Sequence, residues 1–254
     1  MRLETRRRYA PLIDEVRLAK GLPKSAMVPI FQPGTRPALS LGLYSPLLGS
    51  LPADVLQPAQ LTGFPWYDSE DGAAPTLDAD LATFLDSGPA PLIVSLGSFL
   101  PFVADEFYQR SAAIARELGL RAVLLTSEAI SASSPDIMVR SYAPHSLLFP
   151  RAAAIVHHGG VGTMGQALRA GIPQLVVPFW ADQFDNAARA VRMGVGLSAS
   201  PGRYNSGGIK LLRRLLEERE FALTASGIGK QVRDEDGAGV AADAIMRIAQ
   251  PHRH

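Results

Sequence analysis

Hydrophobic positions from residue 78 onward alternate between short continuous apolar runs and longer stretches with apolar residues three or four positions apart. The short runs are typical of strands buried on both faces, and the longer stretches of helices packed on one side. Strands are expected at residues 92–96, 122–125, 137–139, 153–156, 174–177 and 196–197. Helices are expected at residues 78–85, 104–118, 163–170, 182–193, 209–219 and 238–248. This alternation predicts an α/β fold with a Rossmann-like, doubly wound parallel sheet.

The amino-terminal part of the chain has a different pattern. One helical stretch covers residues 12–22, and prolines then recur too closely for long helices or central strands. Residues 1–67 cannot easily bury a core of their own, so they are interpreted as the remnant of an amino-terminal domain with its linker. A polar segment, 68–77, opens the second predicted domain, which extends over residues 68–254.

Composition and charge exclude several classes of protein. The 254 residues are 47% hydrophobic, carry a formal net charge of +1 and include no Cys. A balanced charge argues against nucleic acid as the main partner, and the lack of Cys excludes disulfides and thiolate chemistry. The sequence has neither a membrane-length apolar run nor the apolar stretch of a signal peptide, so a cytoplasmic protein is expected. The arginines at 6–8 favour a solvated helix face, and they leave open a peripheral contact with an anionic membrane.

The segment 157–167, HHGGVGTMGQA, carries the strongest chemical signal. It follows a predicted strand and opens a predicted helix. Glycines at Gly160 and Gly162 leave the amides of the first helical turn open, and the helix dipole favours an anion there. Thr163 and His158 add a hydroxyl and a ring N–H to the same corner. The pattern predicts a diphosphate site that needs no metal, and the alternative is a tight turn around a buried His pair.

Two other loops follow predicted strands. Gly97 and Ser98 form a turn that a phosphate or a sugar could approach, although most Gly-Ser turns are only turns. Tyr142 could stack on a base whose edge pairs with the backbone of Ala143. An interpretation of Tyr142 as a half-buried core residue explains the spacing equally well.

Two further candidate sites contain acidic residues. Asp182 and Gln183 follow the fifth strand and offer groups that hold sugar hydroxyls, and Asp182 is also a candidate helix N-cap. Two D-x-D triplets, 78–80 and 234–236, resemble pairs that hold a divalent cation in other proteins. The first opens a helix and the second lies in a polar loop, so both are interpreted as structural and no metal is expected.

A second interpretation comes from the spacing Gly160-x-Gly162-x-x-Gly165, which matches the dinucleotide fingerprint, with Asp182 about twenty residues further on. It would make the protein an NAD-type oxidoreductase. Two observations count against it. The fingerprint normally follows the first strand of its domain and here follows the fourth, and a nicotinamide site has no use for the preceding His pair.

Taken together, these segments resemble the two-domain (GT-B type) UDP-glycosyltransferases, in particular their sterol-glucosyltransferase-like and antibiotic-glycosyltransferase-like members. The resemblance covers most of residues 90–249 and corresponds to the carboxy-terminal, donor-binding half of that family. It is carried by TGFP at 62–65, YAPH at 142–145, LFPR at 148–151, the segment 157–173, and Pro178-Phe179 with Asp182-Gln183.

The resemblance implies transfer of a hexosyl group, with inversion, from a nucleotide diphosphate sugar to an acceptor hydroxyl. The donor is usually a UDP-sugar, the acceptor a lipid, sterol or natural product, and neither metal nor other cofactor is needed. The matching positions assign the diphosphate to Gly97, Ser98, His158, Gly160, Gly162 and Thr163, the nucleoside to Tyr142, Ala143, His145 and Gln166, and the donor sugar to Asp182 and Gln183. Gln166 departs from the pattern, since many members carry Glu there.

The catalytic base is the largest departure from the family pattern. The family uses a His near the start of its amino-terminal domain, and none of the His residues at 145, 157, 158, 252 and 254 matches that position. The catalytic residue is therefore unknown. A truncated or split transferase is expected, in which a partner chain could carry the acceptor domain. A non-catalytic subunit that binds nucleotide sugars is the remaining alternative.

Overall fold

The computed structural model describes residues 2–24, 37–56, 58–68, 73–97, 101–128, 130 and 133–249. These residues divide into two compact units. The smaller unit takes the residues up to Ser40 together with Ala53–Ala59, and it contains helix α1 (Arg2–Ala19). The larger unit takes Leu41–Pro52 and the residues from Gln60 onward, and it contains the six-stranded sheet.

A six-stranded sheet forms the centre of the larger unit, in the order β5-β4-β3-β6-β7-β8. Every neighbouring pair is parallel. The strands are β3 (Leu92–Ser95), β4 (Ala122–Leu125), β5 (Ile137–Arg140), β6 (Ala154–His157), β7 (Gln174–Val176) and β8 (Gly196–Ser198). The predicted Rossmann-like parallel sheet is confirmed, and each strand lies within a residue or two of its predicted position.

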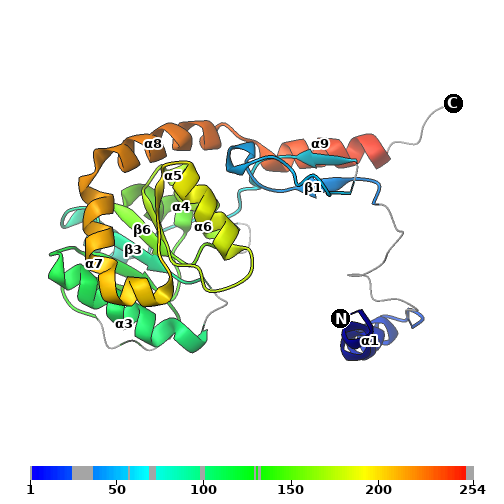
Figure 1. Ribbon diagram of the computed structural model, residues 1–254, viewed down its shortest axis with the longest axis horizontal. Coiled ribbons are helices and arrows are strands. Elements are labelled where there is room, and N and C mark those ends of the chain that lie inside the picture. Colours follow the sequence, from blue (N-terminus) through cyan, green and yellow to red (C-terminus); the bar gives the residue numbers. More distant parts are fainter. Residues whose placement is uncertain are drawn as a thin grey trace. The chain divides into compact units, whose positions relative to one another are not determined.

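Helices cover both faces of this sheet (Figure 1). The connecting and terminal elements are α2 (Ala79–Asp86), α3 (Pro101–Glu117), α4 (His145–Leu148), the 3-10 turn η3 (Phe149–Arg151), α5 (Val161–Ala170), α6 (Gln183–Arg192), α7 (Pro201–Glu217), α8 (Arg219–Arg233) and α9 (Gly237–Ala249). Within the described part of the chain, no helix combines the length and the apolar character that a bilayer span requires.

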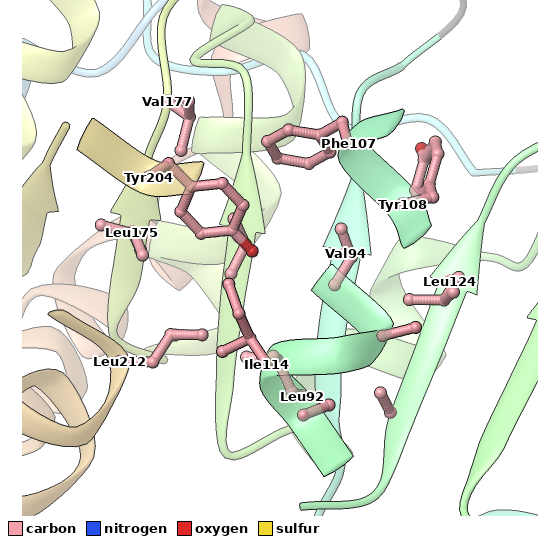
Figure 2. Packing of buried hydrophobic residues seen from close by; sticks show 14 of the residues in the cluster. Leu92, Val94, Phe107, Tyr108, Ile114, Leu124, Leu175, Val177, Tyr204 and Leu212 are labelled. Carbon is pink, nitrogen blue, oxygen red and sulfur yellow. The ribbon is translucent and has the colours of Figure 1, made fainter. Parts of the chain in front are cut away.

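The apolar core divides into layers on the two faces of the sheet because successive strand residues point in opposite directions. Leu92 and Val94 of β3 face α3 and α7, where Phe107 and Tyr204 stack with ring centroids 5.0 Å apart (Figure 2). Ile93 of β3 faces the opposite way, toward α2, α4 and α5. Both faces of every central strand are therefore buried, which explains its continuous apolar sequence.

Short segments precede the six-stranded sheet along the chain. They are β1 (Ser40–Gly42), the 3-10 turn η2 (Pro46–Leu48) and β2 (Ala59–Leu61), and β1 and β2 form a separate two-stranded sheet. Leu48 and Phe64 are buried against residues of α5, α6 and α8. The structure thus groups residues 41–52 and 60–67 with the sheet, while the predicted boundary between residues 67 and 68 stays a prediction.

Helix α8 is the main element that the hydrophobic pattern did not predict, because Gly227 and Gly229 interrupt its sequence. The structure explains Gly229: a Cβ at this position would lie 2.8 Å from the Cα of Gly171 and 2.9 Å from the carbonyl oxygen of Leu168. Close packing of α8 on the end of α5 therefore requires a residue without a side chain, at some cost in helix propensity.

The centre of the sheet determines where a ligand can bind. Strands β3 and β6 are neighbours, and the chain leaves them in opposite directions, toward β4 on one side and β7 on the other. Ligands of doubly wound sheets bind beyond the carboxyl ends of the strands at this reversal point. The last residues of the two strands, Ser95 and His157, are paired in register, so the turns that follow them lie at the reversal point.

Candidate nucleotide-binding site

His157, the last residue of β6, supports the loop that follows it. Its ring is fully buried, its Nδ1 accepts a hydrogen bond from the amide of Gly159 at 3.1 Å, and its Nε2 lies 3.0 Å from Oε1 of Gln174. Burial lowers the pKa of His157 to about 3, with a further contribution from the neighbouring His158. The ring is therefore neutral and carries its proton on Nε2, where the Gln174 oxygen accepts it.

His158 lies between the two glycine loops. A Cβ on Gly97 would lie 3.0 Å from its Cε1, and a Cβ on Gly160 only 2.5 Å from its Nε2, so both positions must lack a side chain. The ring is mostly buried and its Nδ1 makes no hydrogen bond. Burial lowers the pKa of His158, although the Ser95 carbonyl and the Asp182 carboxylate act in the opposite direction. A neutral imidazole thus stands at the reversal point, between the turns at Gly97 and Gly160.

The amino terminus of α5 lies beside this imidazole. The helix begins after Gly160, which provides no side chain to cap it, and its first closing bond is from the amide of Met164 to the Gly160 carbonyl at 2.9 Å. The amides of Val161, Gly162 and Thr163 precede that bond and have no carbonyl partner within the helix. They and the helix dipole favour an anion. Open space surrounds the position of a Cβ on Gly162, so the first turn is accessible.

Gln183, at the start of α6, braces the loop after β7. Its Oε1 accepts the amides of Phe179 at 2.8 Å and Trp180 at 3.0 Å, and the side chain is buried. The same loop holds Ala181 at φ 54°, a conformation that few residues other than glycine adopt. The amide oxygen of Gln183 is therefore already used within the protein. The predicted contact of Gln183 with the donor sugar stays a prediction.

Asn186 links this loop to the glycine-rich loop. Its Nδ2 donates to the carbonyl of Gly159 at 2.9 Å and to Oδ2 of Asp182 at 2.9 Å. Asp182 occupies the N-cap position of α6 but caps no amide, and its side chain remains exposed. Asn186 therefore orients Asp182 toward solvent beside the first turn of α5. The sequence pattern did not single out Asn186, because its position on a predicted helix gave no indication of these contacts.

Two adjoining cavities complete the site. One, of about 440 Å³, is lined by Tyr142 and Ala143, together with Asp68 and the segment 73–76. Ala143 is buried and Tyr142 is 47% exposed. The second cavity, of about 430 Å³, brings together further residues that the sequence nominated: His145, Gly162, Thr163 and Gln166.

Asp68 borders both cavities, and the sequence analysis did not select it. Its Oδ2 accepts the amide of Ser146 at 2.6 Å, and its Oδ1 accepts Nε2 of Gln166 at 3.3 Å. His145 stacks on Phe149 with ring centroids 4.4 Å apart. Burial lowers the pKa of His145, and the Asp68 carboxylate partly offsets this effect. A linker residue of this kind is recognised only through its tertiary contacts.

The structure thus brings nearly all the nominated residues to one edge of the sheet. Gly97, His158 and Gly160 meet at the reversal point, and Gly162 and Thr163 open the adjacent helix. Ser98 lies outside the described residues. The structure gives the positions of the other nominated residues, and the roles of all of them in ligand binding stay predictions.

The acidic triplets are engaged within the protein. Asp78 caps α2 by accepting the amide of Leu81 at 2.8 Å, and Arg140 lies 3.1 Å from Asp78 and 3.5 Å from Asp80. Asp236 accepts the amide of Gly239 at 2.9 Å. Among the described residues, no three His, Asp or Glu side chains group closely enough to hold a metal ion.

The dinucleotide interpretation finds little support in the geometry. The G-x-G-x-x-G segment follows β6, the fourth strand of the sheet along the chain, and not the first. Its third glycine, Gly165, makes room for the linker: a Cβ there would lie 2.7 Å from the ring of Phe64. The spacing of the third glycine therefore reflects packing of residues 60–67 on α5.

The fold is that of a carboxy-terminal domain of the GT-B type, and comparison with known proteins makes this specific. Residues 121–245 match the family described as erythromycin biosynthesis protein CIII-like, C-terminal domain. The chain is 32% identical over 240 residues to O-mycaminosyltylonolide 6-deoxyallosyltransferase of Streptomyces fradiae, covering 94% of this chain and 56% of the relative. It is 31% identical over 223 residues to sterol 3-beta-glucosyltransferase of Aspergillus terreus, covering 80% and 16%.

Solved structures agree with this comparison. The glycosyltransferase VinC, solved in complex with dTDP, superposes with a TM-score of 0.63 at 26% identity, covering 80% of this chain and 50% of VinC. Residues 121–245 therefore match an EryCIII-like C-terminal domain, and the chain's homologues are antibiotic glycosyltransferases and sterol glucosyltransferases. The chain spans about half the length of the Streptomyces fradiae relative and 16% of the length of the Aspergillus terreus relative.

Proposed function

We propose that this chain binds a nucleotide diphosphate sugar and acts as the donor-binding part of a hexosyltransferase. The observation that carries the proposal is the neutral imidazole of His158 beside the open first turn of α5, at the reversal point of the sheet. The glycosyltransferase names of the relatives support the same conclusion.

The proposed reaction is an inverting displacement. An acceptor hydroxyl attacks the anomeric carbon of the donor and gives its proton to a general base. The bond from that carbon to the diphosphate oxygen breaks, and the nucleoside diphosphate leaves with the added negative charge. The amides of Gly162 and Thr163 and the ring of His158 would stabilise the charge that develops on the leaving diphosphate. Asp182, oriented by Asn186, is proposed to hold the hydroxyls of the donor sugar.

We further propose that no divalent cation takes part. The amides at the start of α5 and the imidazole supply the positive potential that a metal would otherwise supply. Asp78 and Asp80 face Arg140, which leaves these carboxylates engaged with a cation of the protein itself. Titrations with UDP should therefore give the same affinity with magnesium present or with a chelator.

Acceptor recognition and the catalytic base are proposed to come from outside the described residues, either from a further part of the protein or from a partner chain. Among the described His side chains, His145 stacks on Phe149, His157 is fully buried, and His158 faces the diphosphate corner. None of the three stands free to deprotonate an acceptor.

The cytoplasmic location stays a prediction.

His158→Ala tests the proposal. Titration calorimetry with UDP and with dTDP should show affinity weakened about ten- to hundred-fold, because a hydrogen bond to a charged group is lost. The control is Arg213→Ala, which removes an exposed positive charge from α7 and should leave the affinity unchanged. Equal affinity of His158→Ala and the parent protein for both nucleotides would contradict the assignment.

A further inference from the structure

Gln174 is a polar residue in the apolar interior of the sheet. It opens β7, it is fully buried, and its neighbour in register on β6 is Ile155. In the described strands β3, β4, β6 and β7, the other polar side chains are Ser95 and His157, which end their strands at the ligand edge. Gln174 lies two residues below that edge, so a ligand there does not contact it.

The side-chain amide of Gln174 uses only part of its hydrogen-bonding capacity. Its Oε1 lies 3.0 Å from Nε2 of His157, whereas its own Nε2 is buried without a hydrogen bond. An unpaired buried amide lowers the stability of the fold, and an apolar residue of similar size would avoid this cost. Packing of the core therefore does not explain Gln174, and its contact with His157 does.

The hydrogen bond from Gly159 determines what Gln174 does for His157. The amide of Gly159 donates to Nδ1 of His157 at 3.1 Å, so Nδ1 carries no proton. In a neutral imidazole the proton is then on Nε2, and this buried N–H needs an acceptor. Oε1 of Gln174 is that acceptor. Gln174 thus selects the tautomer of His157 whose other nitrogen can hold the Gly159 amide.

Gly159 connects His158 to the beginning of α5. Its φ of 94° lies in the region that favours glycine, so it has no side chain of its own to anchor it. Two neighbouring side chains hold its backbone instead: His157 accepts its N–H, and Asn186 donates to its carbonyl at 2.9 Å. A shift of Gly159 would therefore move both the ring of His158 and the first-turn amides of α5.

We propose that Gln174 is a positioning residue for the diphosphate site, because it keeps His157 in the tautomer that holds the turn at Gly159. That turn presents His158 and the first-turn amides of α5 to a diphosphate. This inference rests on the proposed nucleotide-sugar site and adds a residue that acts through others without touching the ligand. A site whose supporting hydrogen bonds are lost binds its ligand more weakly.

Two substitutions of Gln174 test the role. Gln174→Leu removes the acceptor at a similar volume, and Gln174→Glu keeps an acceptor oxygen at the same reach. Calorimetry with UDP should show about three- to ten-fold weaker binding by Gln174→Leu, the effect of one hydrogen bond, and most of this loss restored in Gln174→Glu. Ser111→Ala is the control: it removes a buried hydrogen bond to Tyr204 on the other face of the sheet and should leave UDP affinity unchanged. Thermal unfolding checks that all three variants fold.

Nuclear magnetic resonance of isotope-labelled protein separates positioning from a general loss of stability. In the parent protein, the ring of His157 should carry its proton on Nε2 and none on Nδ1. In Gln174→Leu, hydrogen exchange of the Gly159 amide should accelerate more than that of the β3 amides, because loss of the support loosens the turn without opening the sheet.

A proton on Nδ1 of His157 in the parent protein would overturn the inference without any variant. UDP binding by Gln174→Leu at the affinity of the parent would overturn it too. Equal weakening by Gln174→Leu and Gln174→Glu would show that Gln174 only fills space. In each of these cases, UDP binding by the parent protein leaves the proposed function intact. If the parent binds neither UDP nor inorganic pyrophosphate, the proposed function fails and this inference with it.

Discussion

Two adjacent histidines have different roles because their surroundings differ. His157 uses both ring nitrogens within the protein, as an acceptor for Gly159 and a donor to Gln174. His158 faces the two glycine turns, at Gly97 and at Gly160. The sequence predicts that His158 binds phosphate. Residue type alone does not show that His157 supports the loop. The difference follows from position, because His157 is the last residue of β6 and His158 is the first residue of the loop after it.

The buried ring of His157 predicts how stability depends on pH. Its pKa is about 3 in the folded protein, below the ordinary value of about 6.5, so between these values the unfolded chain binds a proton that the folded chain does not. Stability should therefore fall as the pH falls below 6.5, by about 1 kcal/mol per pH unit from this group. Urea unfolding between pH 7.5 and 5.5 measures the change.

The matched variant is His157→Asn, whose side-chain oxygen can still accept the amide of Gly159. The burial of His145 and His158 also lowers their pKa values, and both remain in the variant. The variant should be less stable at pH 7.5 but should lose less stability on acidification than the parent protein. An unchanged pH slope would show that His157 is not the group responsible.

At the scale of elements, the sequence predicts the central strands well and the glycine-rich helices poorly. Strands such as β3 are buried on both faces, so their apolar runs are unbroken. Helix α7 begins at Pro201, earlier than the predicted residue 209, because Ser200 caps it ahead of several glycines. One of these, Gly208, would bring a Cβ within 2.6 Å of Ile114. Such glycines report close packing between helices, which only the tertiary structure shows.

Helix α8 offers a matched pair of substitutions. Gly229→Ala would place a methyl group against the Gly171 backbone and should destabilise the fold by about 1–3 kcal/mol. Gly227→Ala, two residues earlier, meets nothing within 4 Å and should stabilise the helix by up to about 1 kcal/mol. Urea unfolding of both variants gives the comparison. Equal effects on stability would mean that α8 does not pack on the end of α5 as described.

At the scale of the whole larger unit, the topology of the sheet brings together residues that are far apart in the sequence. The predicted site residues are spread from 97 to 183, and the parallel sheet brings them to one edge because every strand points the same way. The sequence predicts this convergence once the strands are placed. It did not predict Asp68 or Asn186, because their partners, Ser146 and Gly159, are distant along the chain.

The most direct test of the diphosphate site is Gly162→Ala. Side chains on a helix tilt toward its amino terminus, so the added methyl group would stand in front of the first-turn amides without touching the protein. Gly207→Ala in α7, another helical glycine with open space around it, is the control. Calorimetry should show UDP affinity reduced at least about ten-fold by Gly162→Ala and unchanged by Gly207→Ala, with both proteins folded. Undiminished UDP binding by Gly162→Ala would contradict the placement of the diphosphate at this helix.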